Sequence, residues 1–245
     1  MPFDLDVDTD MKNTERHCVM VSGPDVILPD ALYYKEEMAG QRDALLAMWS
    51  NIAKALLAQT DLTAEEQELY LNDTLAFDRA LAGVVKTREE WSNYIKAYNP
   101  MKTSRVATML KTANFRRVLK DLFGELPETV IVAEPRFFKA FTSIFNQDTF
   151  EQYKHWAYVT GLYGSCSLLS EELRDLGGAF MRALSGIAAS TPINKFAYQL
   201  ASQMYSEPVG LYYGEKYFGE EAKKDIIEIV QQIIDTYKSR IEKND

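Results

Sequence analysis

Two helix-start signals of the same kind follow each other closely in this sequence. Thr63-Ala64-Glu65-Glu66 and Thr87-Arg88-Glu89-Glu90 each have the spacing of a capping box. In that motif a threonine hydroxyl and a glutamate carboxylate three residues later satisfy each other's backbone donors at the start of a helix. Both signals stand before runs of helix-forming residues, so they predict a succession of short helices joined by turns.

Apolar residues at spacings of three and four extend this pattern along the chain. A long helical stretch is predicted from Ala31 to Gln59, and Gly83 is the expected end of the helix that Thr63 starts. Residues 106–123 predict one or two helices, and Glu134-Pro135 starts another. The final helix is expected over Glu220 to Lys243. Further helix caps are expected at Asp148, Ser170 and Thr191.

Short β elements are expected at the N-terminus and near residue 130. Phe3 to Val7 and Cys18 to Val21 predict two strands joined by a turn, and Thr129 to Val132 predicts an isolated strand or extended segment. The predicted fold is therefore mainly α, a multi-helix domain with a small N-terminal β-hairpin. We expect residues 1–30 to form the hairpin and lead-in segment, and residues 31–245 to form one compact helical unit.

Charge and cysteine content limit which classes of binding partner and which cellular compartment are expected. The formal net charge is -9, which repels phosphate backbones and anionic lipids, so neither nucleic acid nor a membrane is an expected partner. Residues 1–10 hold four aspartates and no basic residue, unlike the start of a secretory signal. The two cysteines, Cys18 and Cys166, are expected to be reduced rather than bridged, and a cytoplasmic location is the prediction.

Residues that could carry catalysis are few and scattered. The two histidines, His17 and His155, lack the closely spaced companions that a zinc site needs, so each is expected to be a structural or surface residue. Pairing either histidine with a cysteine would require remote segments to meet. Phosphate-binding and dinucleotide motifs are missing, and residues 161–166 lack the spacing of a nucleophile elbow. No catalytic, metal-binding or cofactor-binding residue is predicted in this chain.

Two further groups of residues each have a structural and a functional interpretation. Glu65-Glu66, Glu89-Glu90 and Glu171-Glu172 could act as acid and base, but their places in first helical turns favour capping. Clustered tyrosines could line a peptide-binding cavity or form the edge of a core. These tyrosines are Tyr33, Tyr34, Tyr212, Tyr213 and Tyr217.

Four segments, in order, resemble landmarks of one enzyme family. The first is Leu28-Pro29-Asp30-Ala31-Leu32-Tyr33-Tyr34, and the second is Tyr98-Asn99-Pro100-Met101. The third covers residues 130–137. The fourth covers residues 209–218 and contains Val209-Gly210-Leu211-Tyr212-Tyr213 and Lys216-Tyr217-Phe218. Each is similar to a landmark in the N-terminal helical half of the neprilysin and PepO-like zinc endopeptidases, with a bacterial type suggested by the low cysteine count.

The resemblance implies a two-lobed protease that cleaves oligopeptides. In this family a catalytic lobe holds zinc through H-E-x-x-H and E-x-x-x-D, while a helical lobe covers the active site and limits substrate size. This sequence has neither motif, so the chain looks like the lid lobe alone. Its implied partners are the catalytic lobe of the same polypeptide and an oligopeptide substrate, with zinc in the full-length parent. A freestanding helical interaction module without catalysis is the alternative, and a self-sufficient enzyme with a novel site is a third.

Overall fold

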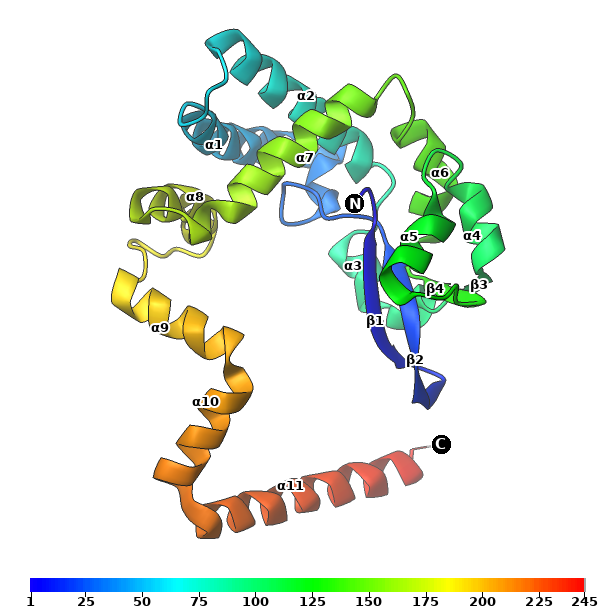
Figure 1. The fold of residues 1–245 in the computed structure, drawn as a ribbon, viewed down its shortest axis with the longest axis vertical. Coiled ribbons are helices and arrows are strands. Elements are labelled where there is room, and N and C mark those ends of the chain that lie inside the picture. Colours follow the sequence, from blue (N-terminus) through cyan, green and yellow to red (C-terminus); the bar gives the residue numbers. More distant parts are fainter. Residues whose placement is uncertain (245) are drawn as a thin grey trace. The chain divides into compact units, whose positions relative to one another are not determined.

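The computed structural model describes residues 1–244, and the chain divides into two compact units, Met1–Ala188 and Ala189–Asp245. Helices dominate both units, and the N-terminal strands form a hairpin, so the predicted fold class is confirmed (Figure 1). The assignment of residues 31–245 to one helical unit stays a prediction. The two units are described separately below.

The first unit contains a four-stranded sheet in the order β1-β2-β4-β3. Strands β1 and β2 form the predicted antiparallel hairpin, β2 pairs in parallel with β4, and β3 is antiparallel to β4. The strand predicted at residues 129–132 is therefore not isolated, because its buried Val130, Ile131 and Val132 place it inside the sheet. Strand β3 was not predicted. The strands span Asp4–Asp10 (β1), Asn13–Ser22 (β2), Pro100–Lys102 (β3) and Thr129–Val132 (β4).

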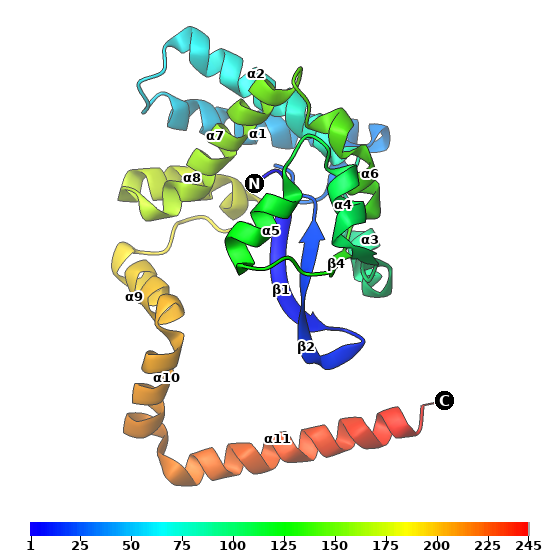
Figure 2. The same cartoon turned by 45° about the vertical axis from the view of Figure 1, so that its right-hand side comes forward.

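Three helices lie beside the sheet (Figure 2). They share with it a core rich in phenylalanine, to which two further helices contribute Phe77 and Trp156. Phe3 in the lead-in to β1 lies 5.6 Å from Phe115 between ring centroids, in an edge-to-face contact. Such pairs add to the free energy gained by burying the rings. The fully buried rings here belong to Phe3, Phe77, Phe115, Phe137, Phe138 and Phe141. The helices are α4 (Thr103–Met109), α5 (Phe115–Phe123) and α6 (Pro135–Ile144).

A second core lies among the longer helices of the same unit. Helix α2 packs along α7, and α1 packs on α8. The capping boxes predicted at Thr63 and Thr87 are both present, at the starts of α2 and α3. The bounds are Ala39–Leu57 (α1), Ala64–Ala82 (α2), Arg88–Ser92 (α3), Phe150–Ser165 (α7) and Glu171–Leu184 (α8).

Several predicted helix starts differ from the observed ones. The helix predicted from Ala31 begins at Ala39, because extended backbone at Lys35 interrupts it after the 3-10 turn Ala31–Tyr34. The cap predicted at Ser170 is confirmed, since its side chain accepts from the Leu173 amide. The caps predicted at Asp148 and Thr191 are wrong: Thr149 and Pro192 occupy those N-cap positions.

The second unit consists of helices that follow one another along the chain (Figure 1). A π-helical turn, Gly214–Phe218, links the second of them to the third. No residue in the described part of this unit, 189–244, is buried. The helices are α9 (Ile193–Met204), α10 (Ser206–Tyr213) and α11 (Gly219–Glu242).

Candidate functional site

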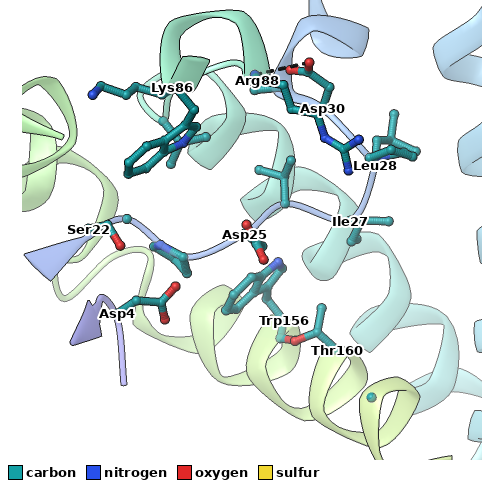
Figure 3. A pocket seen from close by; sticks show the side chains of 18 of the residues that line it. Asp4, Ser22, Asp25, Ile27, Leu28, Asp30, Lys86, Arg88, Trp156 and Thr160 are labelled. Carbon is teal, nitrogen blue, oxygen red and sulfur yellow. Dashed lines mark hydrogen bonds between the residues drawn. The ribbon is translucent and has the colours of Figure 1, made fainter. Parts of the chain in front are cut away.

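A pocket of the first unit with a volume of about 630 Å³ lies along the segment that follows β2 (Figure 3). This segment, residues 22–31, passes between Lys86 and Arg88 on one side and helix α7, which carries Trp156 and Thr160, on the other. Aromatic side chains from α1, α3, α7 and α8 complete the wall. The pocket therefore depends on how residues 22–31 are held.

A buried glutamate holds the start of this segment. Glu134 is 2% exposed, and its carboxylate accepts hydrogen bonds from the backbone amides of Gly23 at 2.7 Å and Lys86 at 2.5 Å. Burial raises the pKa of Glu134 above its usual value, although both amides and the Lys86 charge act in the opposite direction. One side chain thus joins the end of β2, the α2–α3 connection and the start of α6.

A buried aspartate holds the middle of the same segment. Asp78 on α2 accepts hydrogen bonds from the Ile27 amide at 3.1 Å, the Trp156 indole at 3.0 Å and the Tyr34 hydroxyl. Burial raises the pKa of Asp78 to about 6, and the three donors oppose this shift. Burial, followed by the Asp78 charge, raises the pKa of Tyr34 as well. Asp78 therefore fixes the segment against both α2 and α7.

Two polar groups on the pocket wall have no hydrogen-bond partner among residues 1–244. They are the Lys86 Nζ and the Tyr163 hydroxyl. Lys86 lies over the Trp91 ring at 4.6 Å, and desolvation lowers its pKa. Tyr163 stacks on Trp49, and burial raises its pKa to about 12. Buried polar groups of this kind call for an acceptor or donor from elsewhere, so the pocket wall has unmet hydrogen-bonding capacity.

The two histidines lie in different surroundings. His155 Nδ1 lies 2.6 Å from Asp73 Oδ2, and its ring stacks on Tyr70 with centroids 3.9 Å apart. His17 is exposed on β2, opposite Thr9 of β1. The two cysteines are free, with Cys166 buried and Cys18 half-buried. His155 is therefore held between a carboxylate and an aromatic ring, and His17 lies at the surface, while the structural or surface role expected of each stays a prediction.

The paired glutamates lie where helix capping explains them. Glu66 and Glu90 complete the two capping boxes, and Glu90 also binds Arg136 at 2.9 Å. Glu171 lies 3.7 Å from Arg174 in the first turn of α8. The pair Glu171-Glu172, like the other two, therefore has a place at a helix start that needs no catalytic role.

The clustered tyrosines divide between the two units. Tyr34 is tied to Asp78, and Tyr33 packs against the second core, so this pair is structural. Tyr212, Tyr213 and Tyr217 are exposed in the second unit. Lys216 Nζ donates to the Tyr212 hydroxyl at 2.6 Å and lies 5.4 Å from the Tyr217 ring centroid. This second cluster is therefore available for contact.

Exposed apolar residues are concentrated in the second unit. Large apolar side chains project from α9, α10 and α11, and none of these helices has a buried residue. Exposed apolar faces of this extent mark interaction surfaces. On α11 the exposed set is Ile226, Ile227, Ile229, Val230, Ile233, Ile234, Tyr237 and Ile241.

Comparison with known proteins identifies the family. The model of peptidase family M13 matches residues 1–245, the whole length of the chain. The chain belongs to peptidase family M13. It is 34% identical to a neutral endopeptidase of Lactococcus lactis subsp. lactis and 36% identical to one of Lactobacillus helveticus, and covers 39% and 37% of those relatives.

A solved structure has the same fold. The crystal structure of PepO from Lactobacillus rhamnosis HN001 superposes with a TM-score of 0.89 at 28% identity, and the chain covers 39% of it. The matched M13 region is the N-terminal part of larger proteins. The predicted resemblance is thereby confirmed, and the chain spans less than two fifths of the length of these relatives.

The part of this M13 chain that the structure describes does not fit a zinc site. Within residues 1–244, no three His, Cys, Asp or Glu side chains are grouped so that they could hold a metal ion. In the same described part of the chain, no helix is both long and apolar enough to cross a membrane.

Sequence reasoning assigned no role at the pocket to Glu134, which lines it, or to Asp78, which holds Ile27 of the lining segment. In the sequence, Glu134 stands out only before Pro135 at a helix start and within the landmark segment 130–137, and Asp78 lies in the interior of a predicted helix. A carboxylate among core positions was the available signal for Asp78, since it lies one residue after the buried Phe77 and three before the buried Leu81. Buried carboxylates are rare unless they are paired or hydrogen-bonded.

Proposed function

We propose that this chain is the non-catalytic helical part of a zinc metalloendopeptidase that cleaves oligopeptides. In this proposal it covers the active site and restricts substrate size, while the catalytic lobe of the same polypeptide supplies the zinc centre. The observation that carries the proposal is the M13 match over residues 1–245 in a chain that covers 39% of a neutral endopeptidase.

Two features of the chain support a covering role rather than a catalytic one. Within residues 1–244 no three His, Cys, Asp or Glu side chains are grouped so that they could hold a metal ion. Its second unit exposes apolar helix faces that a neighbouring lobe would bury. A covering lobe acts by excluding water and by admitting only peptides that fit the enclosed space. For location we propose the cytoplasm, which the two free thiols support.

The test joins this chain to a catalytic portion. We would co-express it with the part of the Lactobacillus helveticus neutral endopeptidase that lies outside the matched region, and assay a quenched fluorescent peptide and a folded protein. We expect cleavage of the peptide, little cleavage of the folded protein, and none by the chain alone. Equal cleavage of both substrates would contradict the size restriction, and cleavage by the chain alone would contradict the non-catalytic role.

The second candidate is a freestanding helical interaction module. The exposed apolar faces of α9 to α11 favour it as well, because a groove between helices can bind a partner helix without turnover. Tight binding of an isolated amphipathic helical peptide, with no peptide cleavage after co-expression with the catalytic portion, would support this candidate over the first.

A further inference from the structure

Helix α11 has one apolar face along most of its length. Residues 226, 229, 230, 233, 237 and 241 recur at spacings of three and four, and all are exposed large hydrophobics. At 1.5 Å per residue the face from Ile226 to Ile241 is about 22 Å long. An isolated helix gains little stability from its own hydrogen bonds in water, so a face of this kind requires a partner.

The width of this face indicates the kind of partner. Adjacent pairs, Ile226-Ile227, Ile229-Val230 and Ile233-Ile234, widen it beyond the narrow seam that joins two helices of a coiled coil. A second single helix would leave one edge of each pair in water. Burial of the whole face needs several elements on more than one side, as in the core of a large folded body.

The opposite face of α11 is charged with both signs. It carries Glu228 and Asp235 as well as Lys224 and Lys238. Helices that lie on anionic membranes have polar faces rich in lysine and arginine, which this helix does not have. The charge pattern is that of a helix with one side in water and the other in a protein core.

We propose that the apolar face of α11 is the surface through which this chain docks on the remaining portion of an M13 polypeptide. The larger share of each relative lies outside the part that this chain matches, which supplies a folded body of sufficient size. The inference rests on the proposed function, since it specifies the surface through which the lobe described there is held.

A pair of neighbouring substitutions tests this surface. Ile233→Glu puts one negative charge on the apolar face, and Gln232→Glu puts the same charge on the polar face one residue earlier. Each variant would be co-expressed with the tagged complementary portion of the Lactobacillus helveticus enzyme, and the captured complex would be measured. We expect Ile233→Glu to weaken capture at least tenfold and Gln232→Glu to leave it within twofold of the unchanged chain.

Every other outcome of this experiment overturns the inference. Equal capture of both variants would place the docking surface elsewhere while leaving the proposed function intact, and no capture of the unchanged chain would remove the docking altogether. Sedimentation of the chain alone tests whether the face binds a second copy of the chain. A dimer that Ile233→Glu abolishes would assign the face to self-association. Binding to vesicles of phosphatidylcholine and phosphatidylglycerol that Ile233→Glu abolishes would assign it to lipid.

The proposed function fails under different conditions. Capture that depends on Ile233, in a complex that cleaves no peptide, would contradict the peptidase role and leave the docking surface standing. The two readouts, capture and cleavage, therefore separate the two proposals.

Discussion

Glu134 accepts a hydrogen bond of 2.7 Å from the backbone amide of Gly23, which lies 111 residues earlier in the chain. The same carboxylate accepts from the Lys86 amide at 2.5 Å. Position 23 is also crowded, since a Cβ there would lie 2.9 Å from Val85 Cγ1 and 3.1 Å from Glu134 Oε2. The hydrogen bond and the close packing together fix where residues 22–31 begin.

Gly23→Ala should destabilise the chain by roughly 1–3 kcal/mol, the usual cost of overpacking a filled core. Gly40→Ala is the matched control, because nothing lies within 4 Å of a Cβ there and the residue is in helix α1. This control should stabilise by up to about 1 kcal/mol. Urea unfolding followed by circular dichroism gives both values, and equal effects would contradict the crowding at position 23.

Glu134→Ala should cost roughly 2–5 kcal/mol, because it leaves the Gly23 and Lys86 amides buried without an acceptor. Glu134→Gln keeps one acceptor oxygen but turns its NH2 group toward the other backbone amide, which is also a donor, so its loss of stability should be smaller than that of alanine but still clear. Thermal unfolding of both variants measures this order. Glutamine without any loss of stability would contradict the two accepted hydrogen bonds.

Asp78 should make stability fall as the pH rises from about 4 to about 6. Its pKa is raised from 3.8 to about 6, so the folded state holds the proton more tightly than the unfolded state over this range. Below the unfolded pKa of 3.8, Asp78 contributes on the order of 3 kcal/mol to the free energy of unfolding. This contribution is lost as the pH rises above the folded pKa of about 6. Free energies of unfolding from pH 3.5 to 8 should show this loss relative to Asp78→Asn.

A second variant checks the assignment to Asp78. The Tyr34 hydroxyl donates to Asp78 and lowers its pKa, so Tyr34→Phe should extend the fall in stability to higher pH. Parallel pH profiles for the unchanged chain and Asp78→Asn would contradict the prediction.

Gly177→Ala should destabilise by roughly 1–3 kcal/mol, whereas Gly178→Ala should be much milder. A Cβ at position 177 would lie 2.5 Å from Cys166 Cβ, but at position 178 its nearest neighbour is the mobile end of the Arg182 side chain at 2.7 Å. Differential scanning calorimetry of the two variants compares them in the same helix. Equal melting temperatures would contradict a close approach of α8 to Cys166.

The purified chain should retain no stoichiometric zinc after dialysis, and a chelator should leave its melting temperature unchanged. No three ligand side chains within residues 1–244 are grouped around one point, as a zinc site requires. Elemental analysis measures the metal, with a known zinc metalloprotease as the positive control. One zinc ion per chain that is lost in His155→Ala would contradict the structural role of this histidine.

Local signals determined the helices and the family. Each capping box is recognisable from four consecutive residues, so the capped helix starts at Thr63 and Thr87 were predicted correctly. Helix α11 was predicted from the apolar spacing within its own sequence. The four landmark segments likewise indicated the peptidase family that the comparisons confirm. These features depend on residues that are close together in the chain, where helical periodicity and capping chemistry act.

Tertiary structure alone decided the sheet and the pocket. The parallel pairing of Met20 with Ile131 and the bonds from Ile27 and Trp156 to Asp78 join residues that no local pattern connects. Helix periodicity places a side chain on a face but does not say which remote face it meets. A buried carboxylate takes its partners from whatever the packing brings within hydrogen-bond distance, so the roles of Glu134 and Asp78 emerge only from the folded chain.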